Sequence, residues 1–423
     1  MEPIGALAGL RVLEIAQNAA VPHCGRLLAG MGADVVKVEP PEGDAMRGLA
    51  GLGPKEARAY AAINPGKRSM IVDLTAAAAP TVIERLVRWA DVVLVGLKRA
   101  DVGRFGLDWE RVHAINPTVV ELIFTAFGPV GPDADEGGYD VLAQGLSGLG
   151  FIMNRSEEGV PRPTRPAVID FSSGMAATAA VLAALRHRDT TGEGQRVDAS
   201  LLGTAISLGT PIVCRFDVDD AQADEVMDEL RLVRQAGMDF DTQRQLYESR
   251  VVAGAAFRLY FRHYLTADGI ISVAGLSQAL FAKFHRVTGI DPVAPGSDPS
   301  DPAFVAVVDA AEALFARHAT DHWIETLRAA GYPCARYNTP LEAVDDPQVR
   351  ANAYTVDLEH PVFGGYTVSG MPFSVGSSHT ALRGPSPRLG EHTAAVLAEA
   401  GFDASSIDNL VADGVVIAGP PAG

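Results

Sequence analysis

The sequence predicts an α/β protein whose larger domain is a parallel, doubly wound sheet. Short apolar stretches alternate with segments of helical spacing through the first 125 residues, an alternation typical of strand–helix–strand units. A chain of 423 residues is too long for one ordinary core, so we expect two domains. The composition, 48% hydrophobic and 21% charged, fits a soluble globular protein.

The elements of the first domain can be placed in order along the chain. We predict strands at 10–16, 33–39, 69–74, 91–95 and 119–125, and helices at 24–31, 81–89 and 109–115. The turn at 17–23 lacks the glycine fingerprint of a dinucleotide site. Glu39, which ends the second strand, is interpreted as a surface carboxylate, and we reject NAD binding.

Asp170 lies where a short apolar stretch meets a long helical one. Residues 167–169 predict a buried strand end, and the Ala-rich residues 175–185 predict a buried helix. Amide donors at the N-terminus of a helix stabilise a carboxylate, and Asp is also a preferred N-cap residue. By local sequence alone, Asp170 is either a helix cap or a nucleophilic carboxylate.

The rest of the chain predicts a second unit and a return segment. Residues 131–165 are rich in glycine, proline and charge, apart from an apolar stretch at 139–152, and a turn at Gly192 and Gly194 precedes a new element at 196–200. The charged segment 217–248 predicts one or two connecting helices. Further strands are expected at 259–264 and 269–274, and further helices at 280–288, 302–316, 393–400 and 406–413.

Charge and cysteine content restrict the partners. The net charge of -17 argues against a nucleic-acid surface. The three cysteines are too widely spaced for a metal site or a disulfide framework, which favours a reducing cytoplasm. Neither a signal peptide nor an apolar run long enough for a bilayer is visible. We therefore expect a cytoplasmic protein without a metal, a nucleic acid or a membrane as partner.

An ordered set of motifs resembles the family III CoA transferases, the group that includes formyl-CoA transferase and carnitine CoA-transferase. The motifs are LAGLRVLE at 7–14, MGADVVKVEPPEGD at 31–44, NPGKRS at 64–69, YDVLAQGLSG at 139–148, DFSSG at 170–174, TGEGQRVDASLL at 191–202, TADG at 266–269, DPQVR at 346–350 and LGEHT at 389–393. The resemblance implies a Rossmann-like large domain built from both chain ends, a smaller inserted α/β domain, and an interlocked dimer.

Together with the change in composition at residue 217, the resemblance implies four segments. They are a large CoA-binding domain at 1–216, a helical connector at 217–250, a small domain at 251–332, and a return segment at 333–423 that completes the large domain.

The resemblance also implies a role for Asp170. Its carboxylate would attack an acyl-CoA donor to form a mixed anhydride, take up CoA as an aspartyl-CoA thioester, and pass CoA to a carboxylic acid acceptor. At an ordinary pKa of about 4, the side chain is ionised at neutral pH and needs no base. Coenzyme A enters as a substrate, and no permanently bound cofactor is implied.

A CoA site follows from the same resemblance. Lys98 matches the phosphate-binding lysine of the family, and Arg104 lies one position from its arginine. The segment that would lie against adenosine comprises Val72, Asp73, Leu74 and Thr75. Positions near CoA and the reacting groups match Arg47, Tyr139 and Asp140, and for the last two a helix start is an equal alternative. Ala19 replaces a glutamine of formyl-CoA transferase, and residues 252–256 replace a run of glycines, so we expect an acceptor other than oxalate or formate.

Two other functions are considered. An α-methylacyl-CoA racemase would share the fold and the CoA site but needs a histidine where Tyr139 stands, and neither His23 nor His187 matches that position. A non-catalytic CoA-binding subunit of a heteromeric transferase would have no reason to keep Asp170. The acids could be dicarboxylic, aromatic or carnitine-like; Arg258, Arg262 and His263 are either ligands for a carboxylate or a surface face.

Overall fold

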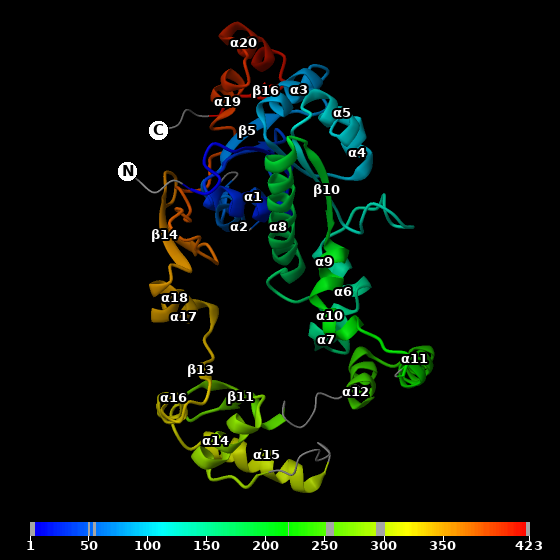
Figure 1. The fold of residues 1–423 in the computed structure, drawn as a ribbon, viewed down its shortest axis with the longest axis vertical. Helices are drawn as coiled ribbons and strands as arrows, with labels where there is room; N and C mark the ends of the chain where they lie inside the picture. Colours follow the sequence, from blue (N-terminus) through cyan, green and yellow to red (C-terminus); the bar gives the residue numbers. More distant parts are fainter. Residues whose placement is uncertain are drawn as a thin grey trace. The chain divides into compact units, whose positions relative to one another are not determined.

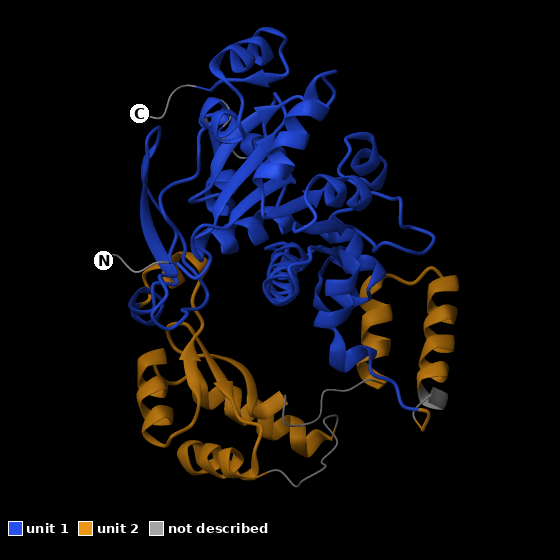
Figure 2. Ribbon diagram, turned by 45° about the horizontal axis from the view of Figure 1, so that its top comes forward, with its two compact units in different colours: residues 1–216, 347–423 blue, residues 217–346 orange. Residues whose placement is uncertain are grey.

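The computed structural model describes residues 5–49, 51–53, 56–218, 220–250, 258–292 and 301–419. The replaced glycine run at 252–256, residues 293–300 and the C-terminal tail at 420–423 lie outside these residues. The chain divides into two compact units, one formed by residues 1–216 and 347–423 and the other by residues 217–346 (Figure 2). The sequence placed the second boundary at residue 333.

A seven-stranded sheet forms the centre of the larger unit, in the order β10-β7-β6-β1-β2-β5-β16. The strands are β1 (Arg11–Ala16), β2 (Asp34–Glu39), β5 (Arg68–Val72), β6 (Val92–Gly96), β7 (Val120–Thr125), β10 (Gln195–Ser200) and β16 (Val416–Ile417). All pairs are parallel except β16 with β5. The chain builds outward from β1 to β5 and then returns to the other side of β1 through β6. Doubly wound sheets bind ligands at this reversal, beyond the carboxyl ends of the strands.

Helices cover both faces of this sheet (Figure 1). One face packs against α1 (Ala20–Gly30) and α8 (Val168–Thr191), and the other against α3 (Ala79–Trp89), α5 (Trp109–Ile115) and α19 (Thr393–Glu399). Neighbouring residues of β1 point to opposite faces, so Val12 joins the first core and Leu13 the second. Because both faces are buried, the strands are largely apolar, except for β10, which is polar and partly exposed.

The larger unit contains further helices and strand pairs. They are η1 (Ala45–Gly48), α2 (Arg58–Ile63), α4 (Arg99–Arg104), α6 (Asp140–Leu146), α7 (Leu149–Met153), α9 (Leu201–Leu208), α10 (Thr210–Val213), α18 (Pro347–Ala351), α20 (Ala404–Ala412), and the strand pairs β3 (Gly51–Gly53) with β4 (Glu56–Ala57), β8 (Arg155–Glu157) with β9 (Val160–Arg162), and β14 (Thr355–His360) with β15 (Gly364–Ser369).

The smaller unit has its own aromatic core. The charged segment predicted as a connector forms two helices, α11 (Asp220–Gln235) and α12 (Phe240–Arg250). An antiparallel sheet of β11 (Phe261–Leu265), β12 (Ile270–Ala274) and β13 (Cys334–Arg336) follows, with α14 (Gln278–Thr288), α15 (Pro302–Phe315), α16 (Thr320–Ala329) and α17 (Pro340–Asp345). Tyr264, Phe284, Phe315 and Trp323 are buried together in the core of this unit.

Two sequence predictions differ from the structure near the functional residues. The strand predicted at 167–169 is absent, because Val168 and Ile169 already belong to the first turn of α8. Helix α1 begins at Ala20 rather than at residue 24. Pro22 falls in its first turn, where a missing N–H leaves no hydrogen bond unmade.

Helix α8 is a core helix. It is the one helix among the described residues with a length and apolar composition that would suit a bilayer. Ile169, Ala177, Val181 and Leu185 recur at helical spacing and are buried against α1 and the sheet. Packing inside the larger unit therefore accounts for these apolar residues of α8, whereas Met175 is 48% exposed.

Gly174 allows α8 to approach α1 closely. A Cβ atom at this position would lie 2.7 Å from the carbonyl oxygen of Ala20 and 2.8 Å from Cβ of His23. The contact brings the first turn of α8, which contains Asp170, against the start of α1.

We predict that Gly174→Ala destabilises the protein. Alanine favours a helix over glycine by about 1 kcal/mol, but the clash with the backbone of α1 should outweigh this gain and leave a net loss of roughly 1–3 kcal/mol. Urea unfolding measures the change. The matched control is Gly145→Ala in α6, where a Cβ would meet nothing within 4 Å and a small gain in stability is expected. Equal effects of the two substitutions would contradict the packing argument.

Candidate functional site

A cavity of about 390 Å³ lies at the carboxyl ends of the central strands, where the strand order reverses. Its wall consists of the turn at 17–21 after β1, residues 96–99 after β6, residues 124–126 and 134–139 after β7, and the side chains of Asp170 and Leu201. The cavity thus occupies the position at which a doubly wound sheet binds its ligand.

The structure distributes the predicted CoA-site residues between two cavities. Lys98 and Tyr139 line the first together with Asp170. Leu74, Thr75 and Arg104 line a second cavity of about 180 Å³.

The other four predicted residues, of which Arg47 is described below, line neither cavity. Val72 is buried in the core. Asp73 accepts hydrogen bonds from the backbone N–H of Thr75 at 2.9 Å and from its hydroxyl at 2.6 Å, and so shapes the turn before the second cavity. Asp140 is buried beneath Asp170.

Asp140 holds the N-terminus of α8. Its Oδ2 atom accepts the backbone N–H groups of Ile169 at 2.8 Å and of Asp170 at 3.1 Å. The amide of Gln144 donates to Oδ1, and the Oε1 atom of Gln144 accepts the N–H of Thr164 at 3.2 Å. The start of α8 and the segment before it are therefore fixed from α6.

Asp170 is not the cap of its own helix. The N-cap residue is Ala167, and Asp170 lies in the first turn. Asp140 takes two of the free N–H groups at this helix end, those of Ile169 and of Asp170 itself, so these two do not stabilise the Asp170 carboxylate as predicted. Burial, and then the neighbouring Asp140, raise the pKa of Asp170 to about 6 instead. At pH 7 the side chain is still about 90% ionised, and it is more basic than an ordinary aspartate.

Neither His23 nor His187 lines the cavity. Burial, and then Arg26 and Lys67, lower the pKa of His23 to about 4, and its ring lies edge-on to Phe171 with centroids 5.2 Å apart. His187 is near the other end of α8, about 25 Å along the helix axis from Asp170. Among the described residues, no histidine lines the cavity, and no group of three or more His, Cys, Asp or Glu residues could hold a metal ion.

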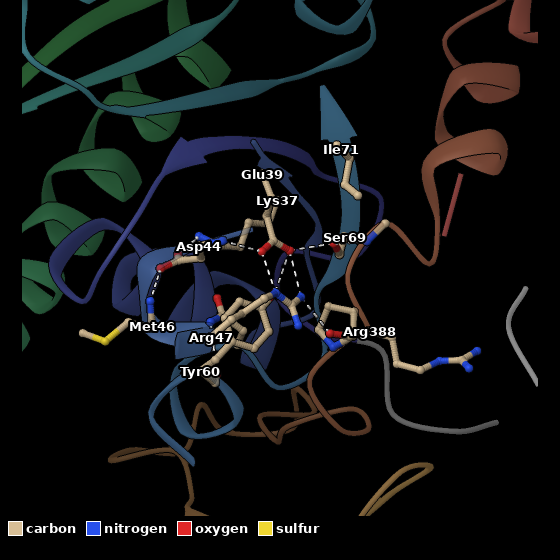
Figure 3. A network of polar contacts seen from close by, with 12 residues as sticks. Lys37, Glu39, Asp44, Met46, Arg47, Tyr60, Ser69, Ile71 and Arg388 are labelled. Carbon is tan, nitrogen blue, oxygen red and sulfur yellow. Dashed lines mark hydrogen bonds and ion pairs between the residues drawn. The ribbon is translucent and has the colours of Figure 1, made fainter. Parts of the chain in front are cut away.

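Arg47 and Glu39 pair with each other in the protein interior (Figure 3). The sequence had placed Arg47 near CoA and Glu39 on the surface. The Arg47 guanidinium donates to both carboxylate oxygens of Glu39, at 2.7 and 2.9 Å, and stacks 3.5 Å from the Tyr60 ring centroid. Burial opposes the charge of Glu39, but Arg47 lowers its pKa to about 2. The interpretation of Glu39 as a surface group is therefore wrong, and the structure gives Arg47 a role in packing.

Other residues of the quoted motifs continue this buried network. Glu14 accepts from Lys37 at 2.9 Å and from Lys67 at 2.7 Å, and all three side chains are at most 4% exposed. Sequence reasoning missed the network, although charged residues inside apolar strands were a visible signal of buried pairing.

Fold, cavity and carboxylate together define a doubly wound α/β protein with a candidate ligand site at the reversal of its sheet. Residues 7–393 match the family described as CoA-transferase family III. The chain belongs to this family and is an acyl-CoA:carboxylate CoA-transferase.

Individual relatives cover nearly the whole chain. A succinate–glutarate CoA-transferase of Agrobacterium fabrum is 34% identical over 93% of this chain and 95% of its own length. A formyl-CoA:oxalate CoA-transferase of Streptomyces avermitilis is 28% identical over 97% and 99%. The crystal structure of a mutant Mycobacterium tuberculosis protein superposes with a TM-score of 0.74 at 26% identity, covering 94% of this chain and all of that one.

We predict that Asp170→Asn stabilises the folded protein at neutral pH. The native carboxyl has a pKa of about 6, above the unfolded value of about 3.9, so the native state binds more protons between these values. Wild-type stability therefore falls as the pH rises from 4 to 6, whereas the amide loses nothing. Urea unfolding should show a gain of roughly 2 kcal/mol above pH 6 that disappears below pH 4. A gain independent of pH would contradict the raised pKa.

Proposed function

We propose that Asp170 is the covalent nucleophile of CoA transfer. The observation that carries this proposal is a half-buried carboxylate of raised pKa in the wall of the cavity at the sheet reversal. A carboxylate that is ionised at neutral pH but has a raised pKa is available for attack and is a stronger nucleophile than an ordinary aspartate. Asp140 supports this role because its charge raises that pKa and its hydrogen bonds fix the helix turn that carries Asp170.

The proposed cycle has four displacements. The Asp170 carboxylate attacks the donor thioester carbonyl, the C–S bond breaks, and CoA thiolate leaves a mixed anhydride. The thiolate then attacks the Asp170 acyl carbon, which releases the donor acid and forms an aspartyl-CoA thioester. The acceptor carboxylate displaces the thiolate to form a second anhydride. Attack of the thiolate on the acceptor carbonyl forms the new thioester and restores Asp170 without net proton transfer.

Oxyanions along this path need backbone donors. The N–H groups of Ile169 and Asp170 at the start of α8 are occupied by Asp140, so they are not the donors we propose. Helix α1 begins at the cavity, its N-cap Ala19 makes no side-chain cap, and Ala20 and Val21 line the wall. We assign the stabilisation of the oxyanion to the first turn of α1.

We propose that the thioester end of CoA lies in the first cavity and that its nucleotide end extends towards the second. Lys98 lines the first cavity, and Arg104 lines the second. Both follow β6 in the chain, and in a protein of net charge -17 such local cations are what phosphate groups require.

Two further proposals concern partners. The succinate–glutarate relative favours short dicarboxylic acids as acceptor and donor acids. A second copy of the chain would cover the exposed apolar side chains of α6, α9 and α10, namely Val141, Leu142, Leu146, Ile206, Leu208 and Ile212. A monomer in sedimentation velocity would contradict the dimer. We expect the dimer to work in the cytoplasm.

The racemase alternative has less support, since no described histidine lines the cavity. Incorporation of solvent deuterium at the α-carbon of an acyl-CoA would favour the racemase, and a transferase predicts none.

We predict that Asp170→Ala abolishes CoA exchange between succinyl-CoA and short dicarboxylic acids, lowering the rate at least about 10³-fold because the covalent route is lost. Chromatography of the thioesters measures the exchange.

In the wild-type enzyme, kcat/KM should fall as the pH decreases through about 6, where Asp170 becomes protonated. Hydroxylamine should trap an adduct on the wild-type peptide that contains Asp170. Full activity of Asp170→Ala would contradict the assignment.

We predict that Lys98→Ala raises the KM for acyl-CoA about tenfold, as expected for the loss of one charged phosphate contact, and changes kcat little. Steady-state kinetics measures both values. The matched control is Arg88→Ala, which removes an exposed cation paired with Glu84 on α3. Equal effects of the two substitutions would show that Lys98 acts only through net charge.

A further inference from the structure

A buried carboxylate outside the cavity holds one section of the cavity wall. Asp44 is 2% exposed and lines neither cavity. Its Oδ1 atom accepts the backbone N–H of Asn18, which does line the first cavity, at 3.2 Å. The same atom caps η1 through the N–H of Met46 at 2.9 Å.

The turn that Asp44 holds has an unusual backbone conformation. Asn18 has φ = 68°, a left-handed conformation that asparagine tolerates better than most residues but that costs free energy in any non-glycine residue. A second hydrogen bond links the same two segments, from the N–H of Ala45 to Oε1 of Gln17 at 3.2 Å. The conformation of the wall is therefore maintained from the segment after β2.

Lys37 forms an ion pair with Asp44 and a hydrogen bond to the main chain at the other end of the turn. Its ammonium lies 2.8 Å from Oδ2 of Asp44 and donates to Glu14 at 2.9 Å and to the carbonyl of Ala16 at 2.6 Å. Two of the lysine N–H donors therefore have acceptors in Glu14 and Ala16, and the contact with Asp44 is an ion pair. Ala16 ends β1 and Asn18 lies two residues later, so the Lys37–Asp44 pair holds the main chain on both sides of Gln17.

We propose that Asp44 is a positioning residue for acyl-CoA. By fixing the N–H of Asn18 and the path of the chain into α1, it holds the cavity wall and the first turn of α1 in the geometry that the thioester requires. The inference rests on the proposed function of that cavity, but the effect on the backbone can be measured without turnover.

The test compares Lys37→Met/Asp44→Asn with Lys37→Met/Asp44→Ala. Removing both charges leaves Glu14 paired with Lys67 and prevents the asparagine amide from facing an ammonium. The two proteins then differ in whether residue 44 can accept the N–H of Asn18. Hydrogen exchange of the peptide spanning residues 13–24 reports the turn, and steady-state kinetics reports the KM for acyl-CoA.

We expect the Ala double variant to exchange faster in this peptide and to have an acyl-CoA KM about tenfold higher than the Asn double variant. The acid limb of the pH profile should be unchanged, since Asp170 is not altered. Should the Lys37→Met background fold poorly, Asp44→Ala against wild type gives the same two readouts. The control for a merely structural effect is Ser69→Ala, a buried partner of Glu39 at 2.6 Å that should lower stability without changing the KM.

Equal exchange and equal KM in the two double variants would overturn the positioning role. So would a rise in KM for Ser69→Ala as large as that for the Ala double variant. A wild-type protein without transferase activity would contradict the proposed function alone, because the difference in hydrogen exchange would still report whether Asp44 holds the turn.

Discussion

The hydrogen bonds from the start of α8 to the Asp140 carboxylate are the interaction on which the account of the site depends. A helix end normally offers its free N–H groups to a nearby anion. Here Oδ2 of Asp140 takes two of them, and Asp170 is left half-buried beside a second carboxylate. The same carboxylate therefore fixes the helix turn and adds its charge to the effect of burial, which is the larger cause of the raised pKa of Asp170.

The sheet reversal brings the other half of the site to this carboxylate. Because the chain turns back at β1 and β6, the turn after β1 and the segment containing Lys98 border one cavity with Asp170. The close approach of α1 and α8 at Gly174 adds the start of α1. Beneath the cavity, buried charges on β1, β2 and the following turn are paired with one another. Breaking one such pair would leave an unpaired charge in the protein interior, which costs free energy. The pairs therefore hold the residues beneath the cavity in place.

Much of the fold could be predicted from the sequence. Apolar strands covered on both faces give continuous hydrophobic runs, and the predictions for β1 and β7 differ from the structure by one residue, whereas α5 agrees at both ends. The contacts of the candidate site could be predicted less well than the fold. That Asp140 caps α8, that Arg47 meets Glu39, and that Asp44 reaches Asn18 all depend on pairing across eight to thirty residues. Local pattern cannot reveal such pairing, and for this reason Glu39 was taken for a surface group and the pKa of Asp170 for an ordinary one.

The central claim is that Asp170 exchanges an oxygen atom with the acid substrates, because the acceptor carboxylate attacks its acyl carbon and leaves an oxygen behind. The most direct measurement uses an acceptor labelled with oxygen-18 in its carboxylate, followed by mass spectrometry of the peptide that contains Asp170. The account predicts that the label appears in that side chain after turnover. Turnover that leaves Asp170 unlabelled would contradict it.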